Sequence, residues 1–299
     1  MLTIAPIAET PEAALVRALP AAPYLRLEAA LRVSLARREL EGAGIFAVAL
    51  GKMGAYELNY SSDIDICVFY EPGVFMEGDF SAGETAQRIA RDLVRMMQEA
   101  TGDGYVFRTD LRLRPDPSST PLAVSTKMAD LYYESVGQNW ERMVWIKARP
   151  TAGDHACAER FLKILQPFVW RRNLDYWALG DIQAIKRMIN SKVGSADLET
   201  VSPDVKLGPG GIREIEFFAQ TQQLILGGRQ PELRDNSTLG ALAALTGAGV
   251  VERATAEELE TAYLALRNLE HRVQMRRDEQ THTVPANEED RRDVAMLCG

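Results

Sequence analysis

The sequence predicts an α+β fold, in which a small mixed sheet over about residues 42–124 is followed by a helical domain. Two observations support this class. Short apolar runs that end at glycine or proline punctuate the first part of the chain, and beyond about residue 125 apolar residues recur at helical spacing. A length of 299 residues and a hydrophobic content of 46% allow a core for one large domain or two small ones.

A helical lead, residues 1–41, is predicted ahead of the sheet. Residues 11–40 are rich in Ala, Leu and Arg at helical spacing and contain few helix breakers. Pro20 and Pro23 are expected to mark the joint between two helices, because proline interrupts a helix interior.

Three strands and one helix are predicted for the sheet region. The apolar run at residues 45–50 ends at a glycine and indicates a buried strand, and residues 64–70 give a second strand, closed by Glu-Pro-Gly. Residues 82–100 have the rhythm of a surface helix. Residues 107–114 alternate between apolar and polar side chains and predict a third strand, which ends at Pro115.

The rest of the chain is predicted to be helical. We therefore expect a sheet-containing domain at residues 42–150 and a helical domain at residues 151–299. The final residues, 291–299, stop in mid-helix without a cap, which indicates one part of a longer chain. The predicted helices are 125–136, 139–148, 158–170, 174–193, 210–226, 237–248 and 255–280.

The composition argues against several classes of function. Acidic residues outnumber basic ones by 42 to 34, for a net charge of -8, which is unlike a nucleic-acid-binding protein. The start of the chain does not resemble a signal peptide, and no run of ~18 apolar residues could span a membrane, so we expect a cytoplasmic protein. Three widely spaced cysteines are too few for a disulfide framework or a zinc site.

The densest chemical signal is a glycine turn followed by two aspartates. Asp63 and Asp65 are two residues apart at the start of a predicted strand, so their carboxylates share a face and suit Mg²⁺, which prefers oxygen ligands and substrate phosphates. The turn ahead of them lets the backbone approach a phosphate. An Asp-x-Asp pair alone is more often a solvated loop, but the turn and the strand around it favour the metal site. The turn and its surroundings supply Gly51, Lys52, Gly54 and Ser62 as candidate phosphate-binding residues.

The predicted strand 107–114 offers a third carboxylate. Its alternation places Arg108, Asp110, Arg112 and Arg114 on one face. One interpretation is an ordinary half-buried strand with a charged outer face. We favour the other, in which Asp110 is the third metal ligand and Arg112 and Arg114 bind phosphate oxygens.

A second glycine-rich turn opens a predicted helix within residues 206–217. Gly210 and Gly211 would expose free N–H groups at the start of the helix, where Arg213 and Glu214 follow, and such a helix start can bind an anion. A tight turn for close packing is an equal alternative, with Arg213 and Glu216 as a surface pair.

The histidines and the remaining aromatic residues are given no role in the site. We expect the histidines to lie on the surface and the aromatic side chains to pack in the core or between domains. These residues are His155, His271, His282, Trp140, Trp145, Trp170, Trp177, Tyr132 and Tyr133.

The motifs together resemble the family of bifunctional glutamine synthetase adenylyltransferase/adenylyl-removing enzymes. The resemblance runs from about residue 44 to residue 285, and the motifs occur in the same order as in the family. The family has Gly-Gly where this sequence has Gly54-Ala55, and its helical segment before the first strand is longer. The motifs are GKMGAYELNYSSDIDI (51–66), FRTDLRLRP (107–115), WERMVWIKARPTAGD (140–154), KLGPGGIREIEF (206–217) and DEQTHTVP (278–285).

The resemblance implies a nucleotidyltransferase-fold catalytic domain at residues 42–150. The family has two such halves, of which the amino-terminal one removes AMP from glutamine synthetase and the other adds it. ELNYSSDID (57–65) and GGIREIEF (210–217) look like the removing half, because the adding half reads ELGYSSDLD and GGITDIEF.

The resemblance also implies the reaction, the cofactor and the partners. Phosphorolysis would convert adenylyl-tyrosine and phosphate to tyrosine and ADP, with two Mg²⁺ ions, or Mn²⁺ in their place. The expected partners are glutamine synthetase, the PII signal protein, ADP or ATP, and phosphate, but no nucleic acid or membrane. The alternatives are an adenylyl- or uridylyltransferase of the same fold that modifies a protein from ATP or UTP, or a non-catalytic module that docks glutamine synthetase or PII.

Overall fold

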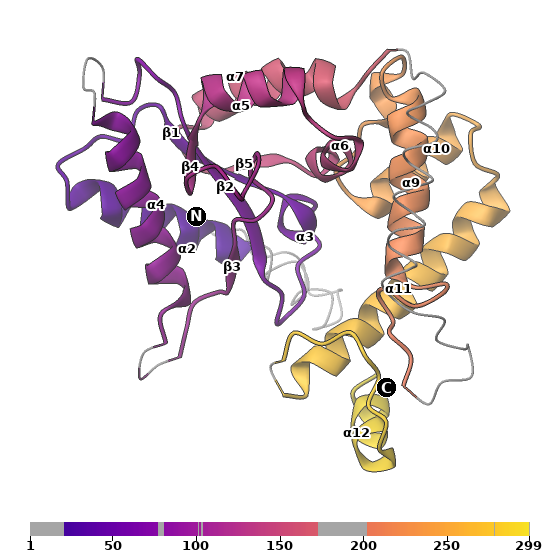
Figure 1. Cartoon of the computed structure of the whole chain (residues 1–299). Coiled ribbons are helices and arrows are strands. Elements are labelled where there is room, and N and C mark those ends of the chain that lie inside the picture. The colour runs from indigo at the N-terminus through magenta and orange to yellow at the C-terminus, as the bar shows by residue number, and fades with distance from the viewer. Residues whose placement is uncertain are drawn as a thin grey trace, which may run out of the picture.

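The computed structural model describes residues 21–76, 81–172 and 202–298, apart from residues 101, 103 and 278. The predicted α+β class is confirmed: a small mixed sheet comes first and a group of helices follows (Figure 1). The predicted helix 174–193 and the start of the helical lead lie outside the described residues. Within the described part of the chain, no helix is long and apolar enough to cross a membrane.

The sheet has five strands, and its centre is the pair that the apolar runs predicted. β1 (Ile45–Ala49) and β2 (Ile64–Tyr70) run antiparallel, and β5 (Arg149–Gly153) is antiparallel to the other edge of β1. β3 (Thr109–Asp110) and β4 (Ala123–Ser125) both pair parallel with β2, at different points along it. The sheet is therefore mixed, as predicted.

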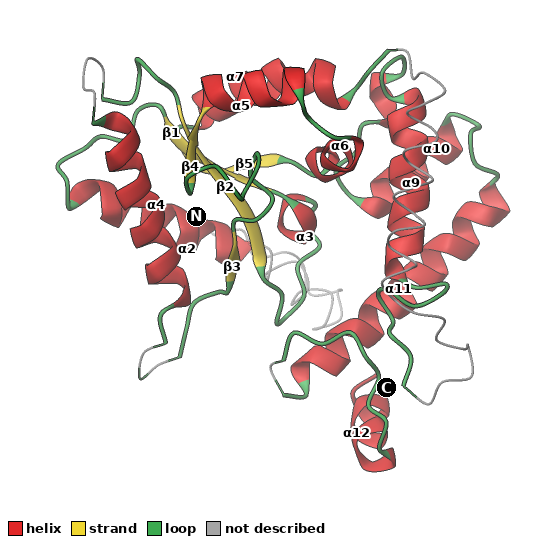
Figure 2. Cartoon of the chain, viewed as in Figure 1, coloured by secondary structure: helices red, strands yellow, loops and turns green. Residues whose placement is uncertain are grey.

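Two layers of helices cover the sheet. Alternate residues of β1 and β2 point into two separate cores, because successive side chains of a strand face opposite sides. One core packs against α2 and α4, and the other against α5, α6 and α7 (Figure 2). These helices are α2 (Ala21–Ala36), α4 (Ala82–Gln98), α5 (Thr126–Ser135), α6 (Asn139–Ile146) and α7 (His155–Val169).

The predicted third strand, residues 107–114, is wrong except at its centre. Only the two residues of β3 pair with β2. Asp110 Oδ1 accepts a hydrogen bond from the backbone N–H of Arg112 at 2.7 Å, and this local bond turns the chain out of the sheet. The predicted alternation of side chains across one face is lost as a result.

The short strands β4 and β5 were missed because their sequences carry no strand signal of their own. β4 has three residues, and β5 contains Pro150, which cannot donate a hydrogen bond to a neighbour. The sheet accepts this proline because β5 is an edge strand and its pairing with β1 shifts register between Ala47 and Val48. The predicted division at residue 150 falls inside β5.

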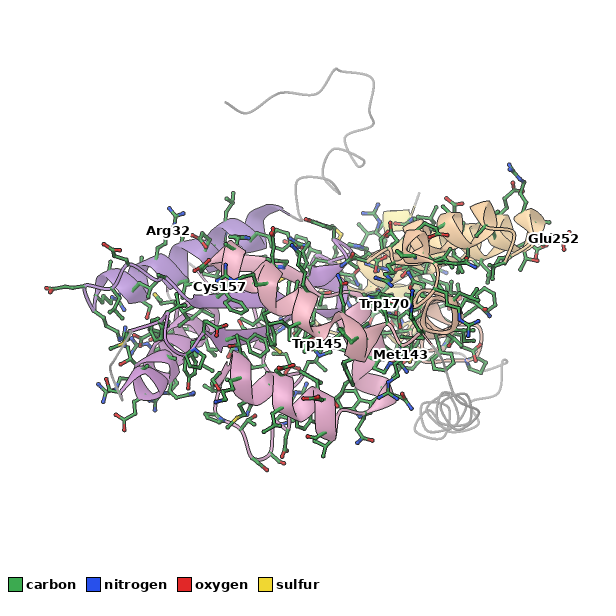
Figure 3. All side chains as sticks on the ribbon, turned by 90° about the horizontal axis from the view of Figure 1, so that it is seen from above. Arg32, Met143, Trp145, Cys157, Trp170 and Glu252 are labelled. Carbon is green, nitrogen blue, oxygen red and sulfur yellow. The ribbon has the colours of Figure 1, made fainter. Side chains whose placement is uncertain are left out.

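The later helices pack beside the sheet unit and confirm the predicted helices there. α9 packs on α6 and α10, and α11 packs on α9, α10 and α12. Seen from above, Arg32 and Glu252 lie at opposite ends of the molecule, with the buried Trp145 between them (Figure 3). The helices are α9 (Ile212–Leu226), α10 (Thr238–Gly247), α11 (Arg253–Met275) and α12 (Glu288–Cys298), with a short 3-10 turn at Pro231–Leu233.

A buried charged network joins the sheet unit to the later helices. Lys147 follows α6, and its Nζ donates to Glu57 Oε2 at 2.8 Å and to Glu216 Oε1 at 2.7 Å. Glu57 follows the one-turn helix α3 (Gly51–Gly54), whereas Glu216 lies on α9. A single buried ammonium group therefore holds carboxylates from both parts of the chain.

The ion pair sets the charge of both partners. Burial alone would raise the pKa of Glu216, but the attraction of Lys147 and Arg213 outweighs it and lowers the pKa to about 2. Burial likewise opposes the charge on Lys147, but Glu216 and Glu57 raise its pKa well above the usual range. Both groups are thus charged at neutral pH.

We expect Lys147→Met to lower the free energy of unfolding by about 3–5 kcal/mol, because Glu57 loses its ammonium partner and Glu216 keeps only the more distant Arg213. Urea unfolding measures this change, and Lys163→Met, at an exposed lysine of α7, is the matched control. A loss no greater than that of the control would contradict a supporting role for Lys147.

Glu216 should make the fold sensitive to acid. Because its pKa in the folded chain lies below the ordinary 4.5, its stabilisation is present above pH 4.5 and is lost as the pH falls toward 2. Glu216→Gln should therefore lose less stability than the unchanged chain between these pH values, although it is less stable at pH 7. Equal slopes in urea unfolding across this range would contradict the assignment.

Candidate functional site

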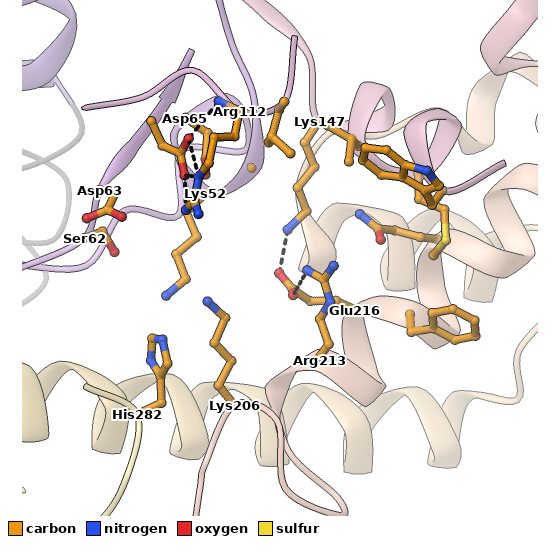
Figure 4. Close-up of a pocket in the computed structure, with 18 of the residues that line it drawn as sticks. Lys52, Ser62, Asp63, Asp65, Arg112, Lys147, Lys206, Arg213, Glu216 and His282 are labelled. Carbon is orange, nitrogen blue, oxygen red and sulfur yellow. Dashed lines mark hydrogen bonds and ion pairs between the residues drawn. The ribbon is translucent and has the colours of Figure 1, made fainter. Parts of the chain in front are cut away.

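A cleft of about 350 Å³ lies between the end of the sheet and the later helices (Figure 4). Its polar walls carry the predicted aspartates from the sheet side and cations from both sides. An apolar part lies between α6 and α9. The residues that line it are Gly51, Lys52, Ser62, Asp63, Asp65, Asp110, Arg112, Leu113, Trp140, Met143, Val144, Lys147, Lys206, Arg213, Glu216, Phe217, Gln220, Gln280 and His282.

The three predicted aspartates line this cleft together. Asp65 on β2 and Asp110 on β3 are register partners in parallel strands, and Asp63 comes just before β2. Gly51 leaves room for them, since a Cβ atom there would lie 2.3 Å from Asp65 Oδ2. The glycine that was predicted for a phosphate therefore also makes space for a carboxylate.

The carboxylates differ in their electrostatic surroundings. Burial raises the pKa of Asp65 to about 6, and the negative charges of Asp110 and Asp63 add to this rise. Burial also opposes ionisation of Asp110, but hydrogen bonds from the side chain and backbone of Arg112 lower its pKa. Asp65 is thus harder to ionise than Asp110.

Oxygen donors of this kind fit a divalent cation. In the structure, however, guanidinium groups neutralise two of the three: Arg108 Nε lies 3.1 Å from Asp63 Oδ1, and Arg112 Nη2 lies 2.6 Å from Asp110 Oδ2. Within the described ranges, no three Asp, Glu, His or Cys side chains converge closely enough to hold a metal ion. The Arg112 side chain is 83% exposed, and its Nε and Nη2 both donate to Asp110 Oδ2.

Arg108, Arg112 and Arg114 line a second, open hollow together, but of the three only Arg112 also lines the cleft. Arg114 does not line the cleft, because its guanidinium donates to four backbone carbonyls, those of Leu111, Pro117, Thr120 and Pro121. These bonds hold the loop between β3 and β4. The geometry gives Arg114 a structural role, and Arg112 remains at the cleft.

The second glycine-rich turn does not present an anion site to the cleft. The Gly210 N–H donates to Glu214 Oε2 at 3.0 Å, so the helix caps its own start, and neither residue lines the cleft. A Cβ atom at Gly211 would lie 2.8 Å from the Gly208 carbonyl oxygen, which favours the alternative of a tight turn. Of the residues predicted in this turn, only Arg213 reaches the cleft.

The first glycine turn is a one-turn helix packed against the end of α6. A Cβ atom at Gly54 would lie 1.9 Å from the Lys147 carbonyl oxygen, so Gly54 is required for close packing and does not line the cleft. Ala55, where the related family has glycine, has a φ of -84°, which any residue adopts. Ser62 lines the cleft, and its Oγ accepts from the Asn59 N–H at 3.3 Å.

Two lysines lie opposite each other at the polar end. Lys52 Nζ donates to Glu270 Oε1, on α11, at 2.7 Å. Burial lowers the pKa of Lys52 to about 8, Glu270 opposes this, and Arg267 and Lys206 reinforce it. The tips of Lys52 and Lys206 approach each other from opposite walls (Figure 4).

Sequence analysis missed several cleft residues. His282 was expected on the surface but lines the cleft, with its Nδ1 3.0 Å from Glu270 Oε1. Trp140, which was expected to pack in the core or between domains, is 40% exposed on the cleft wall, whereas Trp145 is buried as expected. Lys206 and His282 stand inside motifs that carried the family resemblance, so membership in those motifs was the available signal.

Comparison with known proteins identifies related chains. A family described as glutamate-ammonia ligase adenylyltransferase matches residues 7–164, and one described as GlnD PII-uridylyltransferase matches residues 183–299. A protein of Agrobacterium fabrum is 55% identical over 260 residues, 87% of this chain and 26% of the relative. A protein of Caulobacter vibrioides is 57% identical over 257 residues, which are 86% of this chain and 26% of the relative.

Both relatives are named bifunctional glutamine synthetase adenylyltransferase/adenylyl-removing enzyme. The chain spans about a quarter of their length. The first family matches more than half of the chain and covers β1 to β5 with their aspartates. This chain belongs to the glutamate-ammonia ligase adenylyltransferase family.

Proposed function

We propose that this chain carries out the phosphorolytic removal of AMP from adenylylated glutamine synthetase. The observation that carries the proposal is the presence of opposite charges in one cleft: three aspartates line it together with the cations Lys52, Lys206 and Arg213. A phosphodiester and an attacking phosphate need this arrangement, because both are anionic and must be brought together.

Two sequence positions support the removal of AMP over its addition. Residues 59 and 213 are Asn and Arg here, whereas the adding half of the family that this sequence resembles has Gly and Thr. Arg213 lines the cleft and brings an extra cation to it. Asn59 Oδ1 accepts from Arg267 Nη2 at 2.5 Å and so ties the aspartate loop to α11.

The proposed reaction places few demands on acid–base groups. Phosphate is already anionic near neutrality, and the tyrosyl oxygen leaves with a pKa of about 10, so neither a strong base nor a strong acid is required. Lys52 and Arg213 would orient phosphoryl oxygens, and Trp140, Met143 and Phe217 offer an apolar wall for a nucleoside base. If Asp63 and Asp110 leave their arginine partners and come together with Asp65, the three carboxylates would hold Mg²⁺, which would neutralise charge on the phosphoryl oxygens.

The partners are part of the same proposal. Glutamine synthetase as the target is supported by the names of the relatives. PII as a regulator is supported by the match of residues 183–299 to a family described as a PII-uridylyltransferase. We propose that ADP and phosphate occupy the cleft and that the protein acts in the cytoplasm with its target.

Asp65→Asn should reduce AMP removal by about 100-fold or more, because it removes a ligand for the cation that neutralises the phosphoryl group. Titration with Mn²⁺, followed by electron paramagnetic resonance, should show weaker binding in the same variant. Asp130→Asn, on α5 and outside the cleft, is the control. Unchanged metal binding in Asp65→Asn would exclude Asp65 as a ligand.

A pair of assays tests the direction of the reaction. We expect phosphate-dependent release of ADP from glutamine synthetase that carries labelled AMP, and little labelling of unmodified glutamine synthetase from labelled ATP. The opposite pattern would assign the chain to addition. No turnover in either assay, with tight binding to glutamine synthetase, would support a docking module instead.

A further inference from the structure

Lys206 is a cation in the cleft without a counter-ion. It lies half-buried on the helical side, and in the described part of the chain no carboxylate oxygen lies within 4.0 Å of its Nζ. The neighbouring cations all have partners: Lys52 pairs with Glu270, Lys147 with Glu57 and Glu216, and Arg112 with Asp110. Lys206 is therefore the ammonium group of the cleft that is available to a ligand.

The backbone around Lys206 is held rigidly in place. Asp204 Oδ1 accepts from the N–H groups of Lys206 at 2.9 Å and Leu207 at 2.8 Å. The carbonyl oxygen of Lys206 accepts from the Arg213 N–H at 2.9 Å, which anchors the loop to the first turn of α9. The buried Val205 donates its N–H to the carbonyl oxygen of His282 at 2.9 Å. A fixed loop lowers the entropic cost of presenting the side chain to a ligand.

The surroundings of Lys206 favour an anion. Its tip faces the tip of Lys52, from the opposite wall, with His282 beside them (Figure 4). Glu270, the acidic partner of Lys52, is fully buried and is also within 3.4 Å of Arg267 Nε, so its charge is already balanced. Two ammonium groups that face each other repel, and an anion between them removes this repulsion.

A purely electrostatic role beside Asp65 is the competing explanation. Lys206 does lower the pKa of Asp65, after burial and Asp110 have raised it, yet the two form no ion pair. A lysine placed to neutralise Asp65 would be expected to contact it directly. The separation leaves room for a ligand between the carboxylates and the lysine.

We propose that Lys206, with Lys52 opposite, binds a phosphoryl dianion in the cleft. On the proposed function, this group is the free phosphate that attacks, and it becomes the β-phosphate of the ADP that forms. A phosphate oxygen bonds to the phosphorus of AMP, the bond from that phosphorus to the tyrosyl oxygen breaks, and the proton of the hydrogen phosphate ends on the tyrosine. Phosphate and the β-phosphate of ADP thus share one subsite, which AMP leaves empty.

The test is a set of equilibrium binding measurements on the whole chain, with Mg²⁺ present and without glutamine synthetase. Inorganic phosphate, ADP and AMP are titrated separately by calorimetry. Lys206→Ala should weaken phosphate and ADP binding by about tenfold or more and leave AMP binding unchanged, because only the first two ligands place a phosphoryl dianion there. Lys206→Arg should restore most of the affinity, and Lys163→Ala, at an exposed lysine, should change nothing.

Several outcomes would overturn the proposal. They are equal losses for ADP and AMP, unchanged phosphate and ADP binding, or no binding of either by the unchanged chain. If Lys206→Ala lowers the melting temperature, the titrations are repeated with Lys206→Gln. A Lys206→Gln variant that is less stable but binds ADP normally would give Lys206 a structural role.

The binding measurements test this inference separately from the proposed reaction. If the chain adds AMP from ATP, the proposed function is wrong, but the effect of Lys206→Ala on ADP binding relative to AMP binding still tests the role of Lys206. If AMP removal is observed, Lys206→Ala should raise the KM for phosphate about tenfold with a smaller change in kcat. A lower kcat at an unchanged KM would place Lys206 outside the phosphate subsite.

Discussion

The buried bridge from Lys147 to Glu57 and Glu216 is the interaction on which the site depends. Buried charges are costly unless they are paired, so this ammonium group fixes the end of α6, the loop after α3 and the helix α9 in one arrangement. The cleft lies directly beside the bridge. Without it, the two walls of the cleft would lose one of the buried contacts that fix them relative to each other.

The second ionic contact between the two parts, Lys52 with Glu270, sits at the polar end of the same cleft. Arg267 adds to it by reaching Asn59, which lies in the loop just before the aspartates. The later helices therefore contribute more than a cover for the sheet. They position the aspartate loop, and the segment that leads into α9 adds Lys206 and Arg213 to the cations of the cleft.

Two of the corrected predictions share one physical cause. Arg114 was assigned to phosphate from a strand alternation, but a local side-chain bond at Asp110 ended the strand and let Arg114 bind loop carbonyls. Gly210 was assigned to an anion from a helix start, but Glu214 satisfies that start from within the helix. In both cases hydrogen bonds to nearby residues occupy the donor groups that the sequence pattern had assigned to a ligand.

The sequence alone determined the features that depend on neighbours in the chain. The apolar runs located β1 and β2, and the spacing of two residues placed Asp63 and Asp65 together, because strand periodicity is a local property. Only the tertiary structure decided which cations face these carboxylates. Lys206 and His282 reach the cleft from segments more than 140 residues away from Asp65, through contacts that no local pattern encodes.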